Sequence, residues 1–172
     1  MSKKAINNFK RVAVYIFVVL IIIFSTSCSI FTSTNTYTDD EPQAGVLYGP
    51  YKVVRVVDGD TLVVNINSDE VKVRLIGINT PESVHPDKKL NTEEGKLASN
   101  FTKSKVENKS VYLEFDEEIK DPYDRTLAYV FLDKEGKTML QDIILKAGHA
   151  KIMTIEPNTK YAKHFQSLIN ER

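Results

Sequence analysis

The sequence predicts an α+β fold, mainly a closed five-stranded β-barrel with three helices packed outside it. Two observations carry this prediction. Short segments rich in β-branched residues are separated by tight-turn signals, and three other segments repeat apolar residues at helical spacing. In chain order, three strands are followed by a helix, two more strands and two helices.

The first three strands form a meander. Strand 51–57 leads into Asp58-Gly59, a two-residue hairpin signal, and strand 61–66 returns from it. After a second turn, segment 71–78 begins as an alternating strand and ends wholly apolar. A three-stranded sheet alone would leave an apolar face exposed to water.

The remaining elements supply what covers that face. Helical spacing predicts helices over 93–108, 139–147 and 161–169, and strand patterns cover 111–115 and 126–132. Closing five strands into a barrel removes the unpaired edges and buries the apolar face. We therefore predict a five-stranded OB-fold barrel with three helices over residues 49–172.

The N-terminus has the pattern of an export signal. Four basic residues precede an unbroken apolar run over 12–24, which is shorter than the roughly 20 residues that a membrane span needs. Small residues then lead to Cys28, the one cysteine of the chain. We predict a lipoprotein-type signal peptide over 1–27, with Cys28 as the lipidated N-terminus; a plain secretory signal or an uncleaved anchor are the alternatives. The polar segment 28–48 is predicted to be a flexible tether, so that the protein is exported and either held at the outer face of the cell membrane or secreted.

The charge distribution argues against a broad nucleic-acid-binding surface. The whole chain carries 23 basic and 23 acidic side chains, but the export signal holds four of the basic ones and no acid. The remaining residues therefore have a net negative charge, whereas stable nucleic-acid binders are usually basic. Any nucleic-acid role must rest on a local basic site or a bound cation.

Four segments at turns and strand ends carry the residue types that phosphodiester hydrolysis needs. Asp60 and the Asn79-Thr80 segment offer oxygen atoms to a hard cation such as Ca²⁺. Glu82 could orient or deprotonate a water molecule. Arg74 and Arg125 could stabilise the negative charge that grows on the phosphoryl oxygens.

These segments resemble a known family. The chain is similar to thermonucleases of the staphylococcal nuclease family in Asp-Gly-Asp-Thr at 58–61, in Arg-Leu-Ile-Gly-Ile-Asn-Thr-Pro-Glu at 74–82 and in Tyr-Asp-Arg-Thr-Leu-Ala-Tyr at 123–129. The resemblance covers about residues 50–166 and implies an OB barrel with three helices. It also implies calcium-dependent endonucleolytic hydrolysis of DNA and RNA that leaves 3′-phosphate ends.

The resemblance assigns a role to each candidate residue. It implies that Arg74 and Arg125 clamp the phosphate and that Glu82 activates or positions water. It makes Asp60 a direct calcium ligand, and Thr80 a ligand through its backbone carbonyl. Tyr123 is expected near the bound nucleotide.

Two departures from the family pattern affect the expected affinities. Asn79 stands where the best-known member has an aspartate, which removes one negative charge and predicts weaker calcium binding. The segment Met153-Thr154-Ile155 lies where that member places tyrosines against the nucleotide, which predicts weaker base stacking.

Each feature also has a simpler interpretation. Asp60 could only close a hairpin, Thr80-Pro81-Glu82 could only begin a helix, and the two arginines could be surface ion-pair partners worth about 0–1 kcal/mol each. Two other functions remain open, a non-catalytic OB module that binds single strands or a partner, and a structural surface lipoprotein. A monomer is the expected state.

Overall fold

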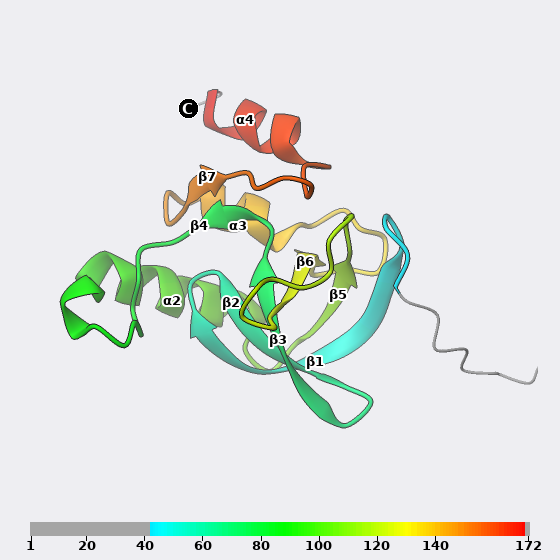
Figure 1. Ribbon diagram of the computed structural model, residues 1–172, viewed down its shortest axis with the longest axis horizontal. Helices are drawn as coiled ribbons and strands as arrows, with labels where there is room; N and C mark the ends of the chain where they lie inside the picture. The colour runs from blue at the N-terminus through cyan, green and yellow to red at the C-terminus, as the bar shows by residue number, and fades with distance from the viewer. Residues whose placement is uncertain (1–41, 171–172) are drawn as a thin grey trace, which may run out of the picture. The chain divides into compact units, whose positions relative to one another are not determined.

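A computed structural model describes residues 42–170 of the chain (Figure 1). The strands are β1 (Leu47–Asp58), β2 (Thr61–Ile66), β3 (Asp69–Leu75), β4 (Gly77–Asn79), β5 (Ser110–Glu114), β6 (Thr126–Phe131) and β7 (Lys151–Met153). The helices are the 3₁₀ turn η1 (Lys88–Leu90) and the α-helices α2 (Glu93–Val106), α3 (Leu140–Lys146) and α4 (Ala162–Asn170). Strand β1 begins within the range 28–48 that is expected to form the tether. The signal segment 1–27 and Cys28 lie outside the described residues.

Five strands close into a barrel in the order β1-β2-β3-β6-β5. All neighbouring pairs are antiparallel except β3 and β6, which run parallel with Val73 opposite Thr126. The long strand β1 pairs with β2 on one side and with β5 on the other, and so closes the barrel. The predicted five-stranded barrel with three α-helices is confirmed.

The prediction of one continuous third strand over 71–78 is wrong. The strand ends at Leu75, and residues 77–79 form the separate strand β4, which pairs with β7 (Figure 1). The break lies at Gly77, whose φ of +82° is a left-handed conformation that favours glycine. A Cβ atom there would also lie 2.4 Å from the ring of Phe165 in α4, so a side chain at this position would push α4 away.

A buried glutamine provides hydrogen-bond partners for the backbone of β6 near the point where the chain leaves the barrel. Gln141 in α3 is fully buried, accepts a hydrogen bond from the Val130 amide at 3.1 Å and donates one to the Ala128 carbonyl at 3.2 Å. Both partners belong to β6. The amide of Ile76 also donates to the Ala128 carbonyl, at 3.1 Å. Buried backbone groups need such partners, so Gln141 stabilises the end of the β3–β6 pair.

Helices α2 and α3 pack against strands of the barrel, and α4 packs against α3. Helix α2 begins at the cap residue Thr92, whose hydroxyl accepts from the Gly95 amide at 2.9 Å, and it packs on β1. Helix α4 contributes the buried side chains of Phe165 and Leu168. Within residues 42–170, no helix is long and apolar enough to cross a membrane.

Candidate active site

The β2–β3 pairing places Asp60 beside Arg74. Thr61 lies opposite Arg74 in the ladder, and the Asp60 carbonyl accepts from the Leu75 amide at 2.9 Å. The Asp60 side chain is 8% exposed, and its Oδ2 lies 3.2 Å from Nη2 of Arg74. A hairpin aspartate that only closed a turn would not need an arginine from the opposite strand.

The residue that follows β4 also binds the Asp60 carboxylate. The amide and the hydroxyl of Thr80 donate to Asp60 Oδ2 at 2.8 and 3.1 Å. Asn79 Oδ1 accepts from Arg74 Nη2 at 3.0 Å. The structure thus brings Asp60, Arg74, Asn79 and Thr80 into one hydrogen-bonded group.

Arg74 is held from several sides. Besides Asp60 and Asn79, its Nη1 donates to the carbonyls of Leu75 and Ile78 at 2.9 and 3.0 Å. Burial lowers the pKa of Arg74, the charge of Asp60 opposes this shift and the charge of nearby Arg125 adds to it. The guanidinium is therefore fixed in position while it remains charged.

Arg125 is oriented by its own loop. Its Nε donates to Asp121 Oδ2 at 2.6 Å, and its amide donates to Asp121 Oδ1 at 2.9 Å. Burial alone would raise the pKa of Asp121, but hydrogen bonds from Arg125 and from the Tyr123 amide prevail and lower it. Tyr123 itself is 81% exposed, with its ring centre 5.5 Å from the guanidinium carbon of Arg125. Tyr123 therefore lies beside Arg125 with most of its surface in solvent.

Glu82 lies on an exposed turn whose backbone is packed against helix α2. The Glu82 carbonyl accepts from the Thr92 amide at 2.9 Å, and a Cβ atom at Gly95 would come within 2.1 Å of that carbonyl oxygen. Partial burial raises the pKa of Glu82, and the negative charges of Asp58 and Asp60 raise it further. A raised pKa makes the Glu82 carboxylate a stronger proton acceptor than a free glutamate, as a general base requires.

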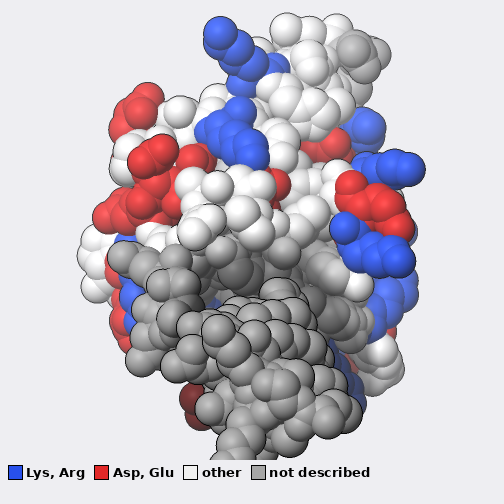
Figure 2. All heavy atoms as spheres, turned by 90° about the vertical axis from the view of Figure 1, so that its right-hand side faces the viewer, with Lys and Arg blue, Asp and Glu red and all other residues white. Residues whose placement is uncertain are grey.

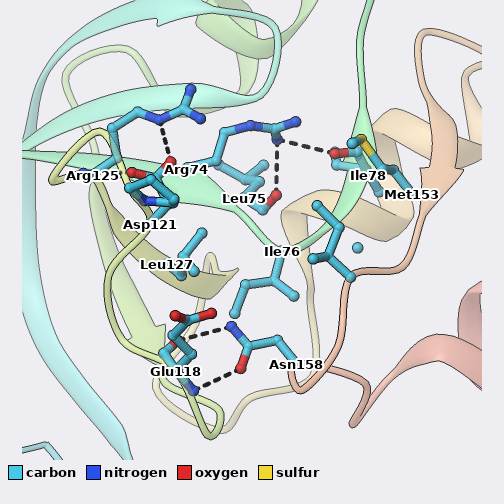
Figure 3. A pocket seen from close by; sticks show the side chains of 13 residues that line it. Arg74, Leu75, Ile76, Ile78, Glu118, Asp121, Arg125, Leu127, Met153 and Asn158 are labelled. Atoms are coloured by element: carbon cyan, nitrogen blue, oxygen red, sulfur yellow. Dashed lines mark hydrogen bonds and ion pairs between the residues drawn. The ribbon is translucent and has the colours of Figure 1, made fainter.

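A pocket of about 130 Å³ lies between the two arginines and strand β7. Figure 3 shows Arg74 and Arg125 along one rim, Leu127 and Ile76 in the middle, and Glu118 and Asn158 at the opposite end. Asn158 is buried and exchanges two hydrogen bonds of 2.8 Å with the backbone of Glu118, which holds that end closed. Met153 and Ile155 also line the pocket. An apolar pocket next to two cations suits a nucleoside that carries a phosphate.

The oxygen atoms beside Arg74 fit a hard divalent cation. Asp58 and Asp60 are both buried, and Glu82 lies within their field, so negative charge accumulates at this turn. Asp60 Oδ1 accepts one bond, from the Thr61 hydroxyl at 3.2 Å, and keeps a lone pair for a ligand. Within residues 42–170, no three His, Cys, Asp or Glu side chains are grouped to hold a metal among themselves. A cation here would therefore need carbonyl, amide and water oxygens in addition to Asp60, as Ca²⁺ accepts.

Four supporting residues were not predicted as part of the site. Asp58 accepts from the hydroxyl of Ser83 at 2.7 Å and so ties the first turn to the Glu82 loop. Asp121 orients Arg125, and Gly95 leaves room for the Glu82 carbonyl because it has no side chain. Of these residues, Asp58 lies within the Asp-Gly-Asp-Thr motif at 58–61, whereas nothing in the sequence marked Ser83 or Gly95.

The comparisons with known proteins agree with this geometry. A family model described as "Staphylococcal nuclease homologue" matches residues 72–171. The thermonuclease of Staphylococcus hyicus is 38% identical over 163 residues, which cover 95% of this chain and 90% of that protein. The thermonuclease of Staphylococcus intermedius is 46% identical over 111 residues, 64% of each chain. Endonuclease YncB of Bacillus subtilis is 36% identical over 144 residues, which cover 78% of this chain and 66% of that protein.

Proposed function

The chain belongs to the staphylococcal nuclease family, and on this premise we propose that it is a calcium-dependent endonuclease that hydrolyses phosphodiester bonds in DNA and RNA. The observation that carries the proposal is the position of Arg74. It pairs with Asp60, lines the same pocket as Arg125 and lies within the electrostatic influence of Glu82. Arg74 and Arg125 line one pocket, and Asp60 and Glu82 act electrostatically on Arg74, so residues from separate strands and loops gather around one guanidinium, which supports a shared chemical task.

Each residue has a distinct part in the proposed reaction. The Glu82 carboxylate takes a proton from a water molecule, and the resulting hydroxide attacks phosphorus. The bond between phosphorus and the 5′ oxygen breaks, the 5′ oxygen takes up a proton from solvent, and the phosphate stays on the 3′ oxygen. Glu82 then releases its proton to solvent. Arg74 and Arg125 stabilise the extra negative charge on the phosphoryl oxygens during the attack.

Calcium completes the site in this proposal. Asp60, the Thr80 carbonyl and the Asn79 side chain would hold it, with water as further ligand. When bound, Ca²⁺ supplies positive charge that offsets the charge of the phosphate. Figure 2 shows Lys and Arg side chains beside Asp and Glu side chains on the face that it draws, so neither sign of charge covers that face alone.

The decisive experiment measures DNA cleavage by the full-length chain with and without Ca²⁺, beside Glu82→Ala. We expect calcium-dependent cleavage, and a fall of about 10²–10⁴-fold in the variant because a general base is lost. Glu135→Ala, in an exposed turn remote from the pocket, is the matched control. The product ends show which bond breaks, because cleavage between phosphorus and the 5′ oxygen leaves a 5′-hydroxyl end. Polynucleotide kinase phosphorylates such an end without prior dephosphorylation.

The other outcomes separate the competing functions. DNA binding without cleavage in both proteins would favour a non-catalytic OB module. Neither binding nor cleavage would favour a structural surface protein.

We also propose that the protein acts outside the cytoplasm as a monomer. The apolar run 12–24 followed by Cys28 supports export and lipid attachment. Metabolic labelling with a palmitate analogue should label the chain and fail to label Cys28→Ala. Equal labelling of both would remove Cys28 as the acceptor, and sedimentation of the detergent-solubilised chain tests the monomer.

A further inference from the structure

A second cleft, of about 270 Å³, adjoins the site at the end of strand β4. It is lined on one side by the segment that follows β4, Asn79, Thr80 and Pro81, and on the other by residues 148–151, which lead from α3 into β7. Two of these residues, Asn79 and Thr80, also belong to the hydrogen-bonded group around Asp60. This hollow, called here the Lys151 cleft, therefore borders the position where a phosphate would react.

The β4–β7 ribbon connects the Lys151 cleft to the pocket of Arg74 and Arg125. At one end of the ribbon Gly77 pairs with Met153, and both residues line the arginine pocket. At the other end Asn79 pairs with Lys151, and both line the Lys151 cleft. The two ends are two residues apart, which corresponds to about 6.6 Å of strand. A polynucleotide strand could therefore occupy both hollows with neighbouring nucleotides.

The charge of the Lys151 cleft favours a phosphate. None of its lining residues is acidic, and the side chain of Lys151 is exposed. The neighbouring surface adds a further cation, because Lys105 lies 4.6 Å from the ring centre of Phe101, which in turn stacks on His149 at 4.5 Å. The hollow beside Tyr123 differs, since Glu70 and Asp124 line it together with two lysines.

We propose that the Lys151 cleft binds the phosphodiester next to the scissile one, with Lys151 as the cationic partner. The inference rests on the proposed function in taking a nucleic-acid strand as the ligand. It assigns the enzyme a substrate that continues past the catalytic group on the side opposite the arginine pocket. A mononucleotide fills the arginine pocket alone and does not reach Lys151.

The test compares Lys151→Met with Lys137→Met. Methionine keeps a long side chain on the strand, and Lys137 is an exposed lysine that lines neither hollow. The probes are a labelled oligothymidylate, followed by fluorescence anisotropy over a range of salt concentrations, and thymidine 5′-phosphate, followed by calorimetry. Urea unfolding midpoints establish that both variants are folded.

We expect Lys151→Met to weaken oligonucleotide binding several-fold, to reduce the slope of log K against log salt by about 0.7, and to leave mononucleotide binding unchanged. In steady-state cleavage of the oligonucleotide, KM should rise while kcat stays close to that of the unaltered chain. An unchanged salt slope, an equal loss for the mononucleotide, or no oligonucleotide binding by the unaltered chain would each overturn the inference. A chain that binds the oligonucleotide but does not cut it would refute the proposed function, and the salt slope would still decide the role of Lys151.

Discussion

The Asp60 carboxylate and the Arg74 guanidinium lie 3.2 Å apart and join the turn after β1 to the end of β3. Arg74 also donates to the carbonyls of Leu75 and Ile78, just where the chain leaves the barrel. Arg125 differs, because its Nε bonds to Asp121 and its terminal nitrogens make no hydrogen bond within residues 42–170. Arg74 thus stabilises the structure in addition to its proposed role at the phosphate, whereas Arg125 has donors free for a ligand.

The two arginines should respond differently to replacement by lysine. Lysine lacks the planar fork, so both variants should lose about 10²–10³-fold in kcat. Arg74→Lys should also lower the free energy of unfolding by about 2–3 kcal/mol, because buried carbonyl acceptors would lose their hydrogen-bond donor. Arg125→Lys should change stability by less than about 1 kcal/mol. Urea titrations beside rate measurements check this, and equal stability losses would contradict the structural role of Arg74.

Asn79→Asp should tighten calcium binding. The new carboxylate keeps the acceptor that Arg74 Nη2 uses and adds a negative charge beside Asp60. The half-saturating Ca²⁺ concentration for cleavage should therefore fall. Asn65→Asp on the β2–β3 hairpin is the matched control, since its Oδ1 accepts only from the Ser68 amide. A calcium titration that stays unchanged in Asn79→Asp would remove Asn79 from the proposed ligand set.

Asp121→Asn should change the response of the protein to acid. The pKa of Asp121 is lowered in the folded state, so its charge contributes stability above the ordinary aspartate pKa. That contribution is lost as the pH falls through the ordinary value towards the lowered one. The variant should be about 1 kcal/mol less stable at neutral pH, and this difference should shrink below about pH 4. Urea unfolding across this pH range tests it, and a gap that grows with acid would show the opposite sign.

Gly95→Ala should separate stability from activity. Alanine favours a helix by about 1 kcal/mol over glycine, but its Cβ would lie 2.1 Å from the Glu82 carbonyl oxygen. The loop that carries Glu82 must shift, and a displacement of about 1 Å can cost about 10²-fold in rate. Leu97→Ala, at an exposed position of the same helix, serves as the control. Full activity in Gly95→Ala would show that the position of Glu82 does not depend on this contact.

The sequence was sufficient to predict the barrel because local patterns specify its strands and turns. The β-branched runs over β1, β2 and β3 and the turn signals between them need no tertiary information. The division of the third strand could not be predicted in the same way. It depends on Gly77 meeting the ring of Phe165, which lies far along the chain. Strand β7 was missed because three residues give no periodicity, and it is specified by its pairing with β4.

The residues of the candidate site were predicted from the sequence, and the structure shows which of them contact one another. Asp60, Arg74, Asn79 and Thr80 form one hydrogen-bonded group, and Arg125 lines the same pocket as Arg74. The hydrogen bonds that orient Arg125 lie within its own loop, whereas the fit of the Glu82 loop against Gly95 is a contact with helix α2 that the sequence does not reveal. The roles of these residues in catalysis stay predictions, as does the attachment of lipid to Cys28.

The way the barrel closes also affects how the chain folds during synthesis. Strands β1, β2 and β3 can pair as soon as they emerge, because each is adjacent to the next in the sequence. The outer edges of β1 and β3 then stay unpaired until β5 and β6 are synthesised, which happens only after helix α2. A nascent chain thus passes through a stage with two open sheet edges, at which association with other chains competes with completion of the barrel.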